Sequence, residues 1–338
     1  MTIQEAIKKV IAGNNLTIEE SIDVFSAIMS GTTTDAQISA LIIALRMKGE
    51  SVEEITGAAS VMREKATHVL PQNKDCVIDT CGTGGDGLNT FNISTATAFV
   101  AAAAGATVAK HGNRSVSSKC GSADVLESLG VNISISPERM RECLDNVGIG
   151  FLFAVSLHNA MKYAIGPRKE IAVRTIFNIL GPLTNPAMAS SQLMGVFSPA
   201  LTETMAMVLK NMGTRCAFVV HGLDALDEIS LSAPTQISEL KNGTVKTYTI
   251  QPEDFGLQRT SLSAIRGGDP SENAQIIKDV LNGKTGPQRD IVLLNTAFAL
   301  TACSLAKDPH EGLTIAAKSI DSGSALKKLE ELVKFTRG

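Results

Sequence analysis

A glycine-rich segment holds the first residues with an evident chemical use. Residues 82–87 read Gly-Thr-Gly-Gly-Asp-Gly and follow residues 76–80, a short run that is typical of a β-strand. Glycine lets backbone N–H groups approach an anion closely, because no Cβ intervenes. We therefore interpret the segment as a phosphate cradle. An ordinary tight strand-to-helix turn is the alternative, but it needs fewer such residues.

Two nucleotide-binding motifs share part of this spacing and fit the sequence less well. A G-x-G-x-x-G site for a nicotinamide cofactor needs an acidic residue at the end of the next strand, where Lys110 and His111 stand instead. A P-loop needs Lys followed by Ser or Thr at the positions of Leu88 and Asn89. The glycines therefore favour phosphate binding of another kind.

Two further segments carry groups that suit phosphate oxygens. Residues 92–95 lie at the predicted start of a helix, where free N–H groups and the helix dipole attract anions, and Ser94 is also suited to bind a metal. Helix capping by Ser94 or Thr95 is the simpler alternative. Residues 110–122 contain three permanent cations, four serines and two glycines. This composition suits a phosphate-rich ligand, although a solvated basic loop has the same composition.

Acidic and basic side chains elsewhere complete the candidate site. Asp227 and Glu228 follow a predicted strand, and adjacent carboxylates at such a place suit Mg²⁺ that is shared with substrate phosphates. A solvated loop is the alternative for this pair. Arg168 lies near the boundary between two parts of the chain and is suited to grip a substrate carboxylate. Lys169 and Arg174 remain equally open for that role.

The composition describes the protein that must position these groups. The 338 residues are 44% apolar and 19% charged, which excludes a disordered chain and predicts about two domains. The 31 basic and 34 acidic residues give a net charge of −3, which argues against nucleic-acid binding through bulk charge. There is no apolar run of about 18 residues and no leader-like start, so we expect a soluble, cytoplasmic protein. The six cysteines form no CxxC pair and are expected to be reduced and mostly buried.

Helix and strand signals divide the chain into two kinds of structure. In the first seventy residues, four S/T-x-x-E/Q capping boxes each precede an amphipathic run and predict helices that start after Thr2, Thr17, Thr34 and Ser51. From residue 76 the pattern changes to short strands and helices, which predicts an α/β part with a mixed sheet. Strands are expected at 76–80, 106–109, 192–197, 217–220, 245–250 and 291–294, and an alanine-rich helix at about 95–104. A helical pattern at 166–186 is expected to rejoin the first part.

These motifs, in this order, resemble those of the anthranilate phosphoribosyltransferases of tryptophan biosynthesis. The resemblance rests on residues 79–86, 92–95, 110–114, 121–127, 174–178, 181–183, 227–228, 267–269 and 272–274. It extends into the C-terminal tail and so covers essentially the whole chain. It implies transfer of the phosphoribosyl group of 5-phosphoribosyl 1-pyrophosphate (PRPP) to the amine of anthranilate. The products are N-(5-phosphoribosyl)anthranilate and pyrophosphate, in the second step of tryptophan biosynthesis from chorismate.

The resemblance also implies an architecture. It implies a small helical domain, formed by residues 1–70 and about 165–188, and a larger α/β domain with a mixed central sheet, formed by residues 74–164 and 189–338. This is the nucleoside-phosphorylase-like phosphoribosyltransferase architecture. A homodimer joined through the helical domains is expected, with Mg²⁺ as cofactor and no nucleic-acid or membrane partner.

The site residues are implied in the same way, by their match to the family's motifs. Anthranilate contacts are expected at Gly82, Asn113 and Arg168, and Mg²⁺ ligands at Ser94, Asp227 and Glu228. PRPP contacts are expected at Gly82, Gly85, Asp86, Thr90, Asn92, Ile93, Ser94, Thr95, Lys110, His111, Gly112, Asn113, Arg114, Ser115, Val116, Ser117, Ser118 and Ser122. No side chain is expected to act as nucleophile or general base, because the arylamine attacks by itself and pre-organised charge stabilises the leaving pyrophosphate.

Two rival functions are weighed against this one. A pyrimidine nucleoside phosphorylase shares the architecture but has no need of an acidic pair that holds magnesium. A relative without activity that binds nucleic acid is expected to lose that pair and to gain a basic surface. This chain has Asp227 and Glu228 and a net charge of −3, which favours the transferase.

Overall fold

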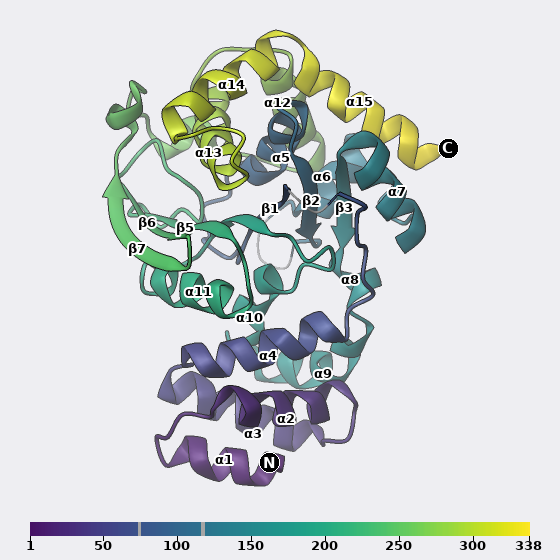
Figure 1. Cartoon of the computed structure of the whole chain (residues 1–338), viewed down its shortest axis with the longest axis vertical. Coiled ribbons are helices and arrows are strands. Elements are labelled where there is room, and N and C mark those ends of the chain that lie inside the picture. Colours follow the sequence, from purple (N-terminus) through teal and green to yellow (C-terminus); the bar gives the residue numbers. More distant parts are fainter. Residues whose placement is uncertain (74–75, 116–118) are drawn as a thin grey trace.

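Four helices form the N-terminal part of the protein, at the bottom of Figure 1. The computed structural model describes residues 1–73, 76–115 and 119–338. The four helices are α1 (Ile3–Ile11), α2 (Ile18–Met29), α3 (Asp35–Lys48) and α4 (Val52–Glu64). Each begins after its predicted capping residue, and the capping box is formed in all four. The predicted helix starts are therefore confirmed.

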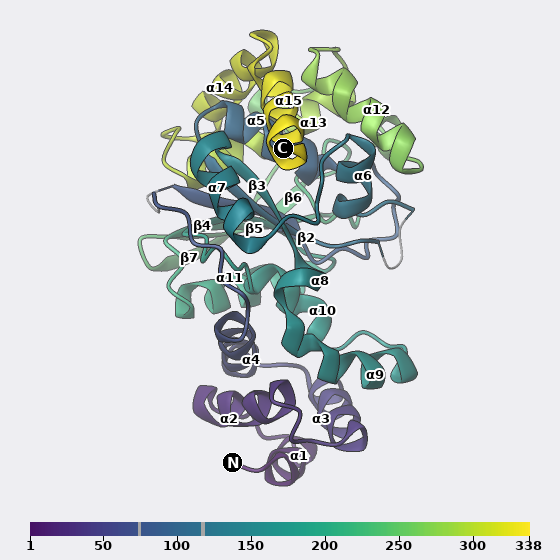
Figure 2. The ribbon, with the colours of Figure 1, turned by 90° about the vertical axis from the view of Figure 1, so that its right-hand side faces the viewer.

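A later segment returns to these helices. α9 (Lys162–Ile171) packs against α2 and α3 (Figure 2), although three strands of the sheet separate it from these helices in the sequence. The short helices α10 (Phe177–Leu180) and η2 (Gly181–Leu183) follow. The ring of Phe177 meets that of Phe25 in α2 edge to face, with 6.0 Å between centroids. The helical segment that begins at Lys162 therefore packs beside the N-terminal helices.

A seven-stranded mixed sheet lies at the centre of the larger part. Its spatial order is β3-β2-β1-β4-β5-β6-β7. The strands β3, β2, β1, β4 and β5 run parallel to one another. β6 pairs antiparallel with β5 on one side and with β7 on the other. The strands are β1 (Val77–Gly82), β2 (Thr107–Gly112), β3 (Ile149–Phe153), β4 (Ser191–Gly195), β5 (Cys216–Gly222), β6 (Thr235–Lys241) and β7 (Thr244–Ile250).

Helices cover both faces of this sheet. On one face lie α5 (Ile93–Ala103) and α13 (Pro287–Ala302), with α14 (Pro309–Asp321) and α15 (Ser324–Arg337) outside them (Figure 1). On the other face α11 (Ala200–Asn211) separates the sheet from α4. The remaining helices are α6 (Ser122–Ser128), α7 (Pro137–Val147), α8 (Ala154–Leu157), η1 (Asn159–Met161), η3 (Pro252–Phe255), η4 (Leu262–Ile265) and α12 (Pro270–Leu281).

The strand expected at residues 291–294 is wrong. These residues lie inside α13 and are all buried. An apolar run this short has no periodicity that separates a buried helix from a buried strand. β3 and β6 are not among the expected strands, because β3 is short and contains a glycine, and β6 carries Gln, Ser, Glu and Lys.

The cysteines and the membrane expectation are both tested by the structure. None of the six cysteines, all of which lie in the described residues, forms a disulfide, and five of them are buried, as expected. The sixth, Cys76, is half-buried. In the part of the chain that the structure describes, no helix is both long and apolar enough to cross a membrane.

Candidate active site

The predicted site residues follow the carboxyl ends of neighbouring parallel strands. β1, β2 and β5 end at Gly82, Gly112 and Gly222, and a loop singled out in the sequence follows each of them. Parallel strands end at the same edge of a sheet, so the three loops lie along one edge. The sheet thereby gathers the glycine-rich segment, the basic loop and the acidic pair.

The glycine-rich segment is shaped by conformations that glycine favours. Gly84, Gly85 and Gly87 have φ of 65°, 80° and 77°. The Gly84 N–H donates to Asp227 Oδ2 at 2.9 Å. A Cβ at Gly82 would lie 3.0 Å from the same oxygen, which leaves little room for a side chain. The loop after β1 therefore lies directly against the acidic pair.

The start of α5 presents the backbone N–H of Ser94 to the same pair. Asn92 is the N-cap residue but makes no side-chain cap, because its amide bonds the Cys120 carbonyl and Asn273. The Ser94 N–H donates to Glu228 Oε1 at 3.1 Å. Helix capping therefore does not account for Ser94. The positive end of the helix meets a carboxyl, as the helix dipole favours.

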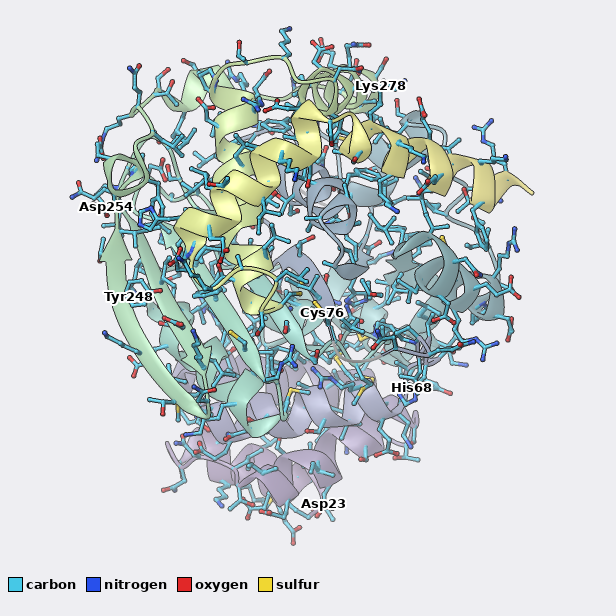
Figure 3. The ribbon with its side chains drawn as sticks, turned by 45° about the horizontal axis from the view of Figure 1, so that its top comes forward. Asp23, His68, Cys76, Tyr248, Asp254 and Lys278 are labelled. Atoms are coloured by element: carbon cyan, nitrogen blue, oxygen red, sulfur yellow. The ribbon has the colours of Figure 1, made fainter. Side chains whose placement is uncertain are left out.

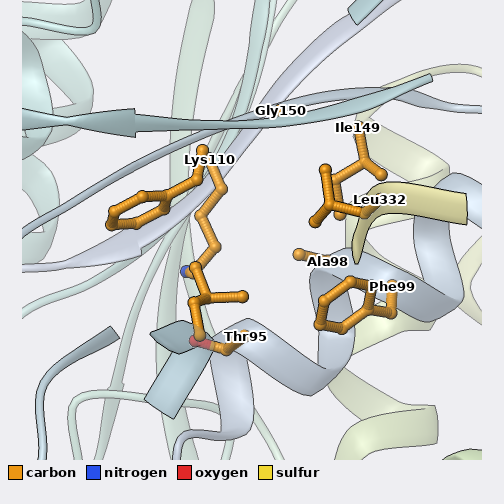
Figure 4. A pocket seen from close by; sticks show the side chains of 9 residues that line it. Thr95, Ala98, Phe99, Lys110, Ile149, Gly150 and Leu332 are labelled. Carbon is orange, nitrogen blue, oxygen red and sulfur yellow. The ribbon is translucent and has the colours of Figure 1, made fainter. Parts of the chain in front are cut away.

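Lys110 is a buried cation between β1, β2 and α5. Its ammonium donates to the Thr80 carbonyl and, at 3.2 Å, to the Ser94 hydroxyl. Burial lowers the pKa of this ammonium, and the neighbouring Asp79 and Glu228 carboxyls oppose that shift. Figure 4 shows Lys110 lining a small pocket between α5 and β3.

Thr95 lines the same small pocket on the α5 side (Figure 4). Its hydroxyl is buried and has no hydrogen-bond partner among the described residues. Ile93, just before it, is a fully buried member of the main hydrophobic core. At the start of α5, therefore, the Ser94 N–H faces the acidic pair, and the N–H groups of Ile93 and Thr95 donate to backbone carbonyls.

His111 is engaged by protein groups at both ring nitrogens. Nδ1 lies 3.2 Å from the Gly181 carbonyl oxygen, and Nε2 lies 3.1 Å from Nε2 of His158. Burial, reinforced by His158, lowers the pKa of His111 to about 3, so the ring stays neutral. The His111 backbone N–H donates to Asp79, which also accepts from Asn185 at 2.7 Å. This ring does not suit a general base.

The rest of the basic loop folds around an acidic residue of α6. Arg114 pairs with Glu127 at 2.6 Å and with Asp124 at 2.9 Å, and these partners hold the pKa of its guanidinium above the usual range. The Ser115 N–H also donates to Asp124. The predicted contacts Val116, Ser117 and Ser118 lie outside the described residues.

Three further predicted contacts, Thr90, Gly112 and Ser122, are held in place by neighbouring segments of the protein. Thr90 forms an isolated antiparallel bridge with Arg266. The Ser122 hydroxyl donates to the Asn113 carbonyl at 3.3 Å. A Cβ at Gly112 would lie 2.2 Å from the Ser122 hydroxyl oxygen, so the close approach of β2 and α6 requires glycine there.

Asp227 and Glu228 are a crowded pair of acids. Burial, reinforced by Asp86, raises the pKa of Asp227 to about 7. Burial and the charge of Asp227 raise the pKa of Glu228 to about 8. A Cβ at Gly195, the last residue of β4, would lie 1.6 Å from the Asp227 carbonyl oxygen. The acidic loop is therefore held tightly against the end of β4.

This pair suits a divalent cation that a ligand helps to hold. Within the described ranges, no group of three or more His, Cys, Asp and Glu is placed to hold a metal ion unaided. Mg²⁺ commonly uses one or two protein carboxylates and completes its shell with water and substrate phosphates. Acids whose ionisation is opposed by burial and repulsion gain most from a nearby cation. The oxygen donors Ser94, Asp227 and Glu228 therefore fit Mg²⁺.

Two arginines lie where the helical part meets the sheet. The guanidinium of Arg168, in α9, lies 5.3 Å from the centroid of the Phe177 ring, and burial lowers its pKa. Arg174 donates to the Gly85 carbonyl, and its guanidinium lies 4.4 Å from the centroid of the Phe197 ring. Arg174 thus touches the glycine-rich segment, and Arg168 lies half-buried beside the core of the helical part.

Four residues that shape the site are not among the expected substrate and metal contacts: Asp79, His158, Asn185 and Gly195. Asp79 is fully buried within β1, and an acidic residue inside an apolar run is the signal that points to such an anchor. The other three carry no local signal, because their roles depend on partners that only the fold brings near.

The class of protein is defined by its two family domains. Residues 4–66 match the helical bundle domain of a glycosyl transferase family, and residues 74–326 match the α/β domain of that family. The chain is therefore a glycosyl transferase of this two-domain class. The predicted combination of a small helical part and a larger α/β part with a mixed sheet is confirmed.

Relatives within this class narrow the assignment. The anthranilate phosphoribosyltransferase of Acetivibrio thermocellus is 56% identical over 99% of this chain and 96% of its own length. The crystal structure of the anthranilate phosphoribosyltransferase from Thermus thermophilus matches this chain with 42% sequence identity and a TM-score of 0.93. The match covers 98% of this chain and 99% of the Thermus chain. The anthranilate phosphoribosyltransferase from Saccharomyces cerevisiae in complex with PRPP and Mg is 29% identical, with a TM-score of 0.89. This match covers 99% of this chain and 98% of the yeast chain.

The yeast protein has also been solved with 4-fluoroanthranilate. This chain belongs to the anthranilate phosphoribosyltransferases. It is accordingly a pentosyl-transferring enzyme of tryptophan biosynthesis, and the function predicted from the motifs is confirmed.

Proposed function

We propose that PRPP binds along the sheet edge where the three loops meet, and that anthranilate attacks it there. The reaction transfers the phosphoribosyl group of PRPP to the amine of anthranilate and releases pyrophosphate. One observation supports this placement above the others. The Gly84 and Ser94 N–H groups donate to Asp227 and Glu228, so two phosphate-type segments and the acidic pair form one continuous lining.

The PRPP residues are those expected from the sequence. The diphosphate is held by the glycine-rich segment, the start of α5 and the basic loop, and the metal by Ser94, Asp227 and Glu228. The contacting residues are Gly82, Gly85, Asp86, Thr90, Asn92, Ile93, Ser94, Thr95, Lys110, His111, Gly112, Asn113, Arg114, Ser115, Val116, Ser117, Ser118 and Ser122. Arg114 must exchange at least one of its two carboxylate partners to reach a phosphate.

Anthranilate binds on the side of the helical part. Gly82, Asn113 and Arg168 are its contacts, and the guanidinium of Arg168 pairs with the substrate carboxylate in a bidentate manner. The half-buried position of Arg168 strengthens such a pair, because its charge is only partly solvated. Arg174 ties the segment after α9 to Gly85 and so aligns the two substrate sites.

Catalysis in this arrangement is electrostatic. The amine nitrogen forms a bond to the ribose C1 as the bond from C1 to the pyrophosphate oxygen breaks. That oxygen keeps the electron pair, and the proton that the nitrogen loses passes to solvent. Mg²⁺, when bound, supplies positive charge to the leaving pyrophosphate. Lys110 adds a fixed cation, and the backbone N–H groups of residues 85–87 add dipoles that need no reorganisation. The neutral ring of His111 transfers no proton.

The assembly and setting of the enzyme belong to the same proposal. We place it in the cytoplasm as a homodimer joined through the helical domains, without nucleic-acid or membrane partners. The domain division is residues 1–70 with about 165–188, against 74–164 with 189–338. The contacts of α9 with α2 and α3 support the grouping of these distant segments.

Anthranilate fluorescence tests the proposed reaction. With PRPP and Mg²⁺ present, the purified chain is expected to quench the fluorescence and to release one pyrophosphate for each anthranilate consumed. Omission of Mg²⁺ is expected to stop both signals. Phosphorolysis of thymidine or uridine without pyrophosphate release would instead identify a nucleoside phosphorylase.

A further inference from the structure

Three cysteines meet at the end of the sheet opposite the proposed active site. Cys76 immediately precedes β1, Cys216 is the first residue of β5, and Cys303 is the C-cap residue of α13. In the sheet, Ser191 at the start of β4 is paired with β1 on one side and with Cys216 on the other. The Ser191 hydroxyl donates to the Ala302 carbonyl at 2.9 Å, which places the end of α13 over the start of these strands.

Two of these cysteines are in direct contact. The Cys76 thiol donates to the Cys303 carbonyl oxygen at 3.4 Å, although the two residues are 227 positions apart. The two thiols are also near enough to shift each other's pKa, with that of Cys76 lowered and that of Cys303 raised. Figure 3 labels Cys76 beside the chain coloured as the end of α13 and its following turn. The fold therefore places the two cysteines side by side.

Cys76 has the surroundings of a reactive thiol. It is half-buried, whereas the other five cysteines are buried. The neighbouring Cys303 thiol and the positive charge of the exposed Arg215 lower the pKa of the Cys76 thiol. Burial raises the pKa of Cys120, Cys143 and Cys216 to about 11, 12 and 11. An accessible thiol with a lowered pKa and a thiol neighbour is the arrangement found in redox-sensitive pairs.

We propose that Cys76 and Cys303 are a reversible oxidation site, at which peroxide converts the two thiols into a disulfide. The Cys76 sulfur attacks hydrogen peroxide, the O–O bond breaks, hydroxide leaves, and Cys76 becomes a sulfenic acid. The Cys303 sulfur then attacks the Cys76 sulfur. The S–S bond forms, the S–O bond breaks, and the hydroxyl leaves as water with the Cys303 proton. Both sulfur atoms are oxidised, and peroxide is reduced to water.

The disulfide acts on stability and leaves the chemistry unchanged. Cys76 lies at the opening end of β1, and the glycine-rich segment lies at the other end, roughly 20 Å away at about 3.3 Å per strand residue. The crosslink ties β1 to the end of α13 and closes a long loop, which restricts the unfolded chain. Oxidation is therefore expected to raise the unfolding temperature and to leave turnover unchanged.

Peroxide treatment of the full chain, followed by intact-mass measurement and peptide mapping, tests the site. The parent protein is expected to lose two hydrogen atoms, to yield one crosslinked peptide that contains Cys76 and Cys303, and to recover on reduction with dithiothreitol. Cys76→Ser and Cys303→Ala are each expected to abolish this change. Cys143→Ser, which removes a buried thiol of α7, is the matched control and is expected to oxidise like the parent.

Several results would overturn the proposal. They are a crosslink that joins Cys76 to Cys216, a crosslinked Cys303→Ala variant, and a parent protein that only gains oxygen atoms. Loss of turnover on oxidation, with recovery on reduction, would contradict the separation of the pair from the active site. Cys303→Ala and the parent are compared for unfolding temperature before oxidation, so that a folding defect is not read as loss of the site.

Discussion

Replacing Asp227 with asparagine is expected to lower activity and, at the same time, to stabilise the metal-free protein. Asparagine keeps the side chain's size and an oxygen that accepts the Gly84 N–H, but it removes the charge that faces Asp86 and Glu228. Loss of a pre-organised electrostatic partner is expected to lower turnover by about 10²-fold or more, alone or with Glu228→Gln. Near-normal turnover across Mg²⁺ concentrations would reject the metal assignment.

The expected gain in stability follows from the raised pKa. The pKa of the Asp227 carboxyl rises from 3.8 to about 7 in the folded protein. At about 1.36 kcal/mol per pKa unit, the stability that ionisation of this carboxyl removes has an upper limit of roughly 4 kcal/mol. The folded protein binds this proton more tightly than the unfolded chain does. Ionisation therefore costs progressively more stability as the pH rises from about 4 to about 7, and the cost is complete above that range.

The net gain in the free energy of unfolding is smaller than this limit, because the repulsion between Asp227 and Glu228 is one interaction that belongs to both residues. We expect Asp227→Asn to raise the free energy of unfolding by about 1–2 kcal/mol at pH 8, and by about half of that or less at pH 5. Urea unfolding in EDTA at the two pH values measures both quantities.

Asp308→Asn serves as a control of opposite sign. The Asp308 carboxylate caps α14 by accepting the Glu311 N–H, which lowers its pKa, so its charge stabilises the fold above its unfolded pKa. Asp308→Asn is therefore expected to lower stability at pH 8. If Asp227→Asn were no more stable than the parent at pH 8, the acidic pair would not be crowded and the reasoning would fail.

Three further substitutions probe other parts of the site. Arg168→Ala is expected to raise mainly the KM for anthranilate; an effect on the PRPP KM alone would reverse the placement of the two substrates. Lys110→Gln is expected to lower turnover by about 10²-fold while the near-ultraviolet circular dichroism is kept, and unaltered turnover would exclude Lys110 from catalysis. Gly195→Ala is expected to cost about 1–3 kcal/mol in urea unfolding and to weaken the Mg²⁺ response, since its Cβ would lie 1.6 Å from the Asp227 carbonyl oxygen. Gly181→Ala, with nothing within 4 Å of its Cβ, is the control, and equal losses in both variants would contradict this reading.

Elements that depend on local signals were predictable from the sequence. The capping boxes at Thr2, Thr17, Thr34 and Ser51 fix four helix starts, because donor and acceptor lie within four residues of each other. The segment 291–294 has no such local signal. Its burial in α13 depends on the strands that it packs against, so its composition is compatible with either a helix or a strand.

The candidate site was predictable as a set of segments and not as a set of contacts. Strand ends and residue types indicate that the loops after β1, β2 and β5 meet at one edge. The Gly84 contact with Asp227 and the stacking of Arg174 on Phe197 arise only once the sheet has formed. The pairing of Arg114 with Glu127 likewise depends on where α6 packs.

The position of the metal in crystals of the PRPP complex decides whether this sheet edge is the active site. Mn²⁺ in place of Mg²⁺ gives an anomalous signal that locates the ion independently of the protein. We predict a peak that the Ser94 hydroxyl and the Asp227 and Glu228 carboxylates share with pyrophosphate oxygens. PRPP and Mn²⁺ bound at another place, with the two carboxylates facing only water, would contradict the assignment.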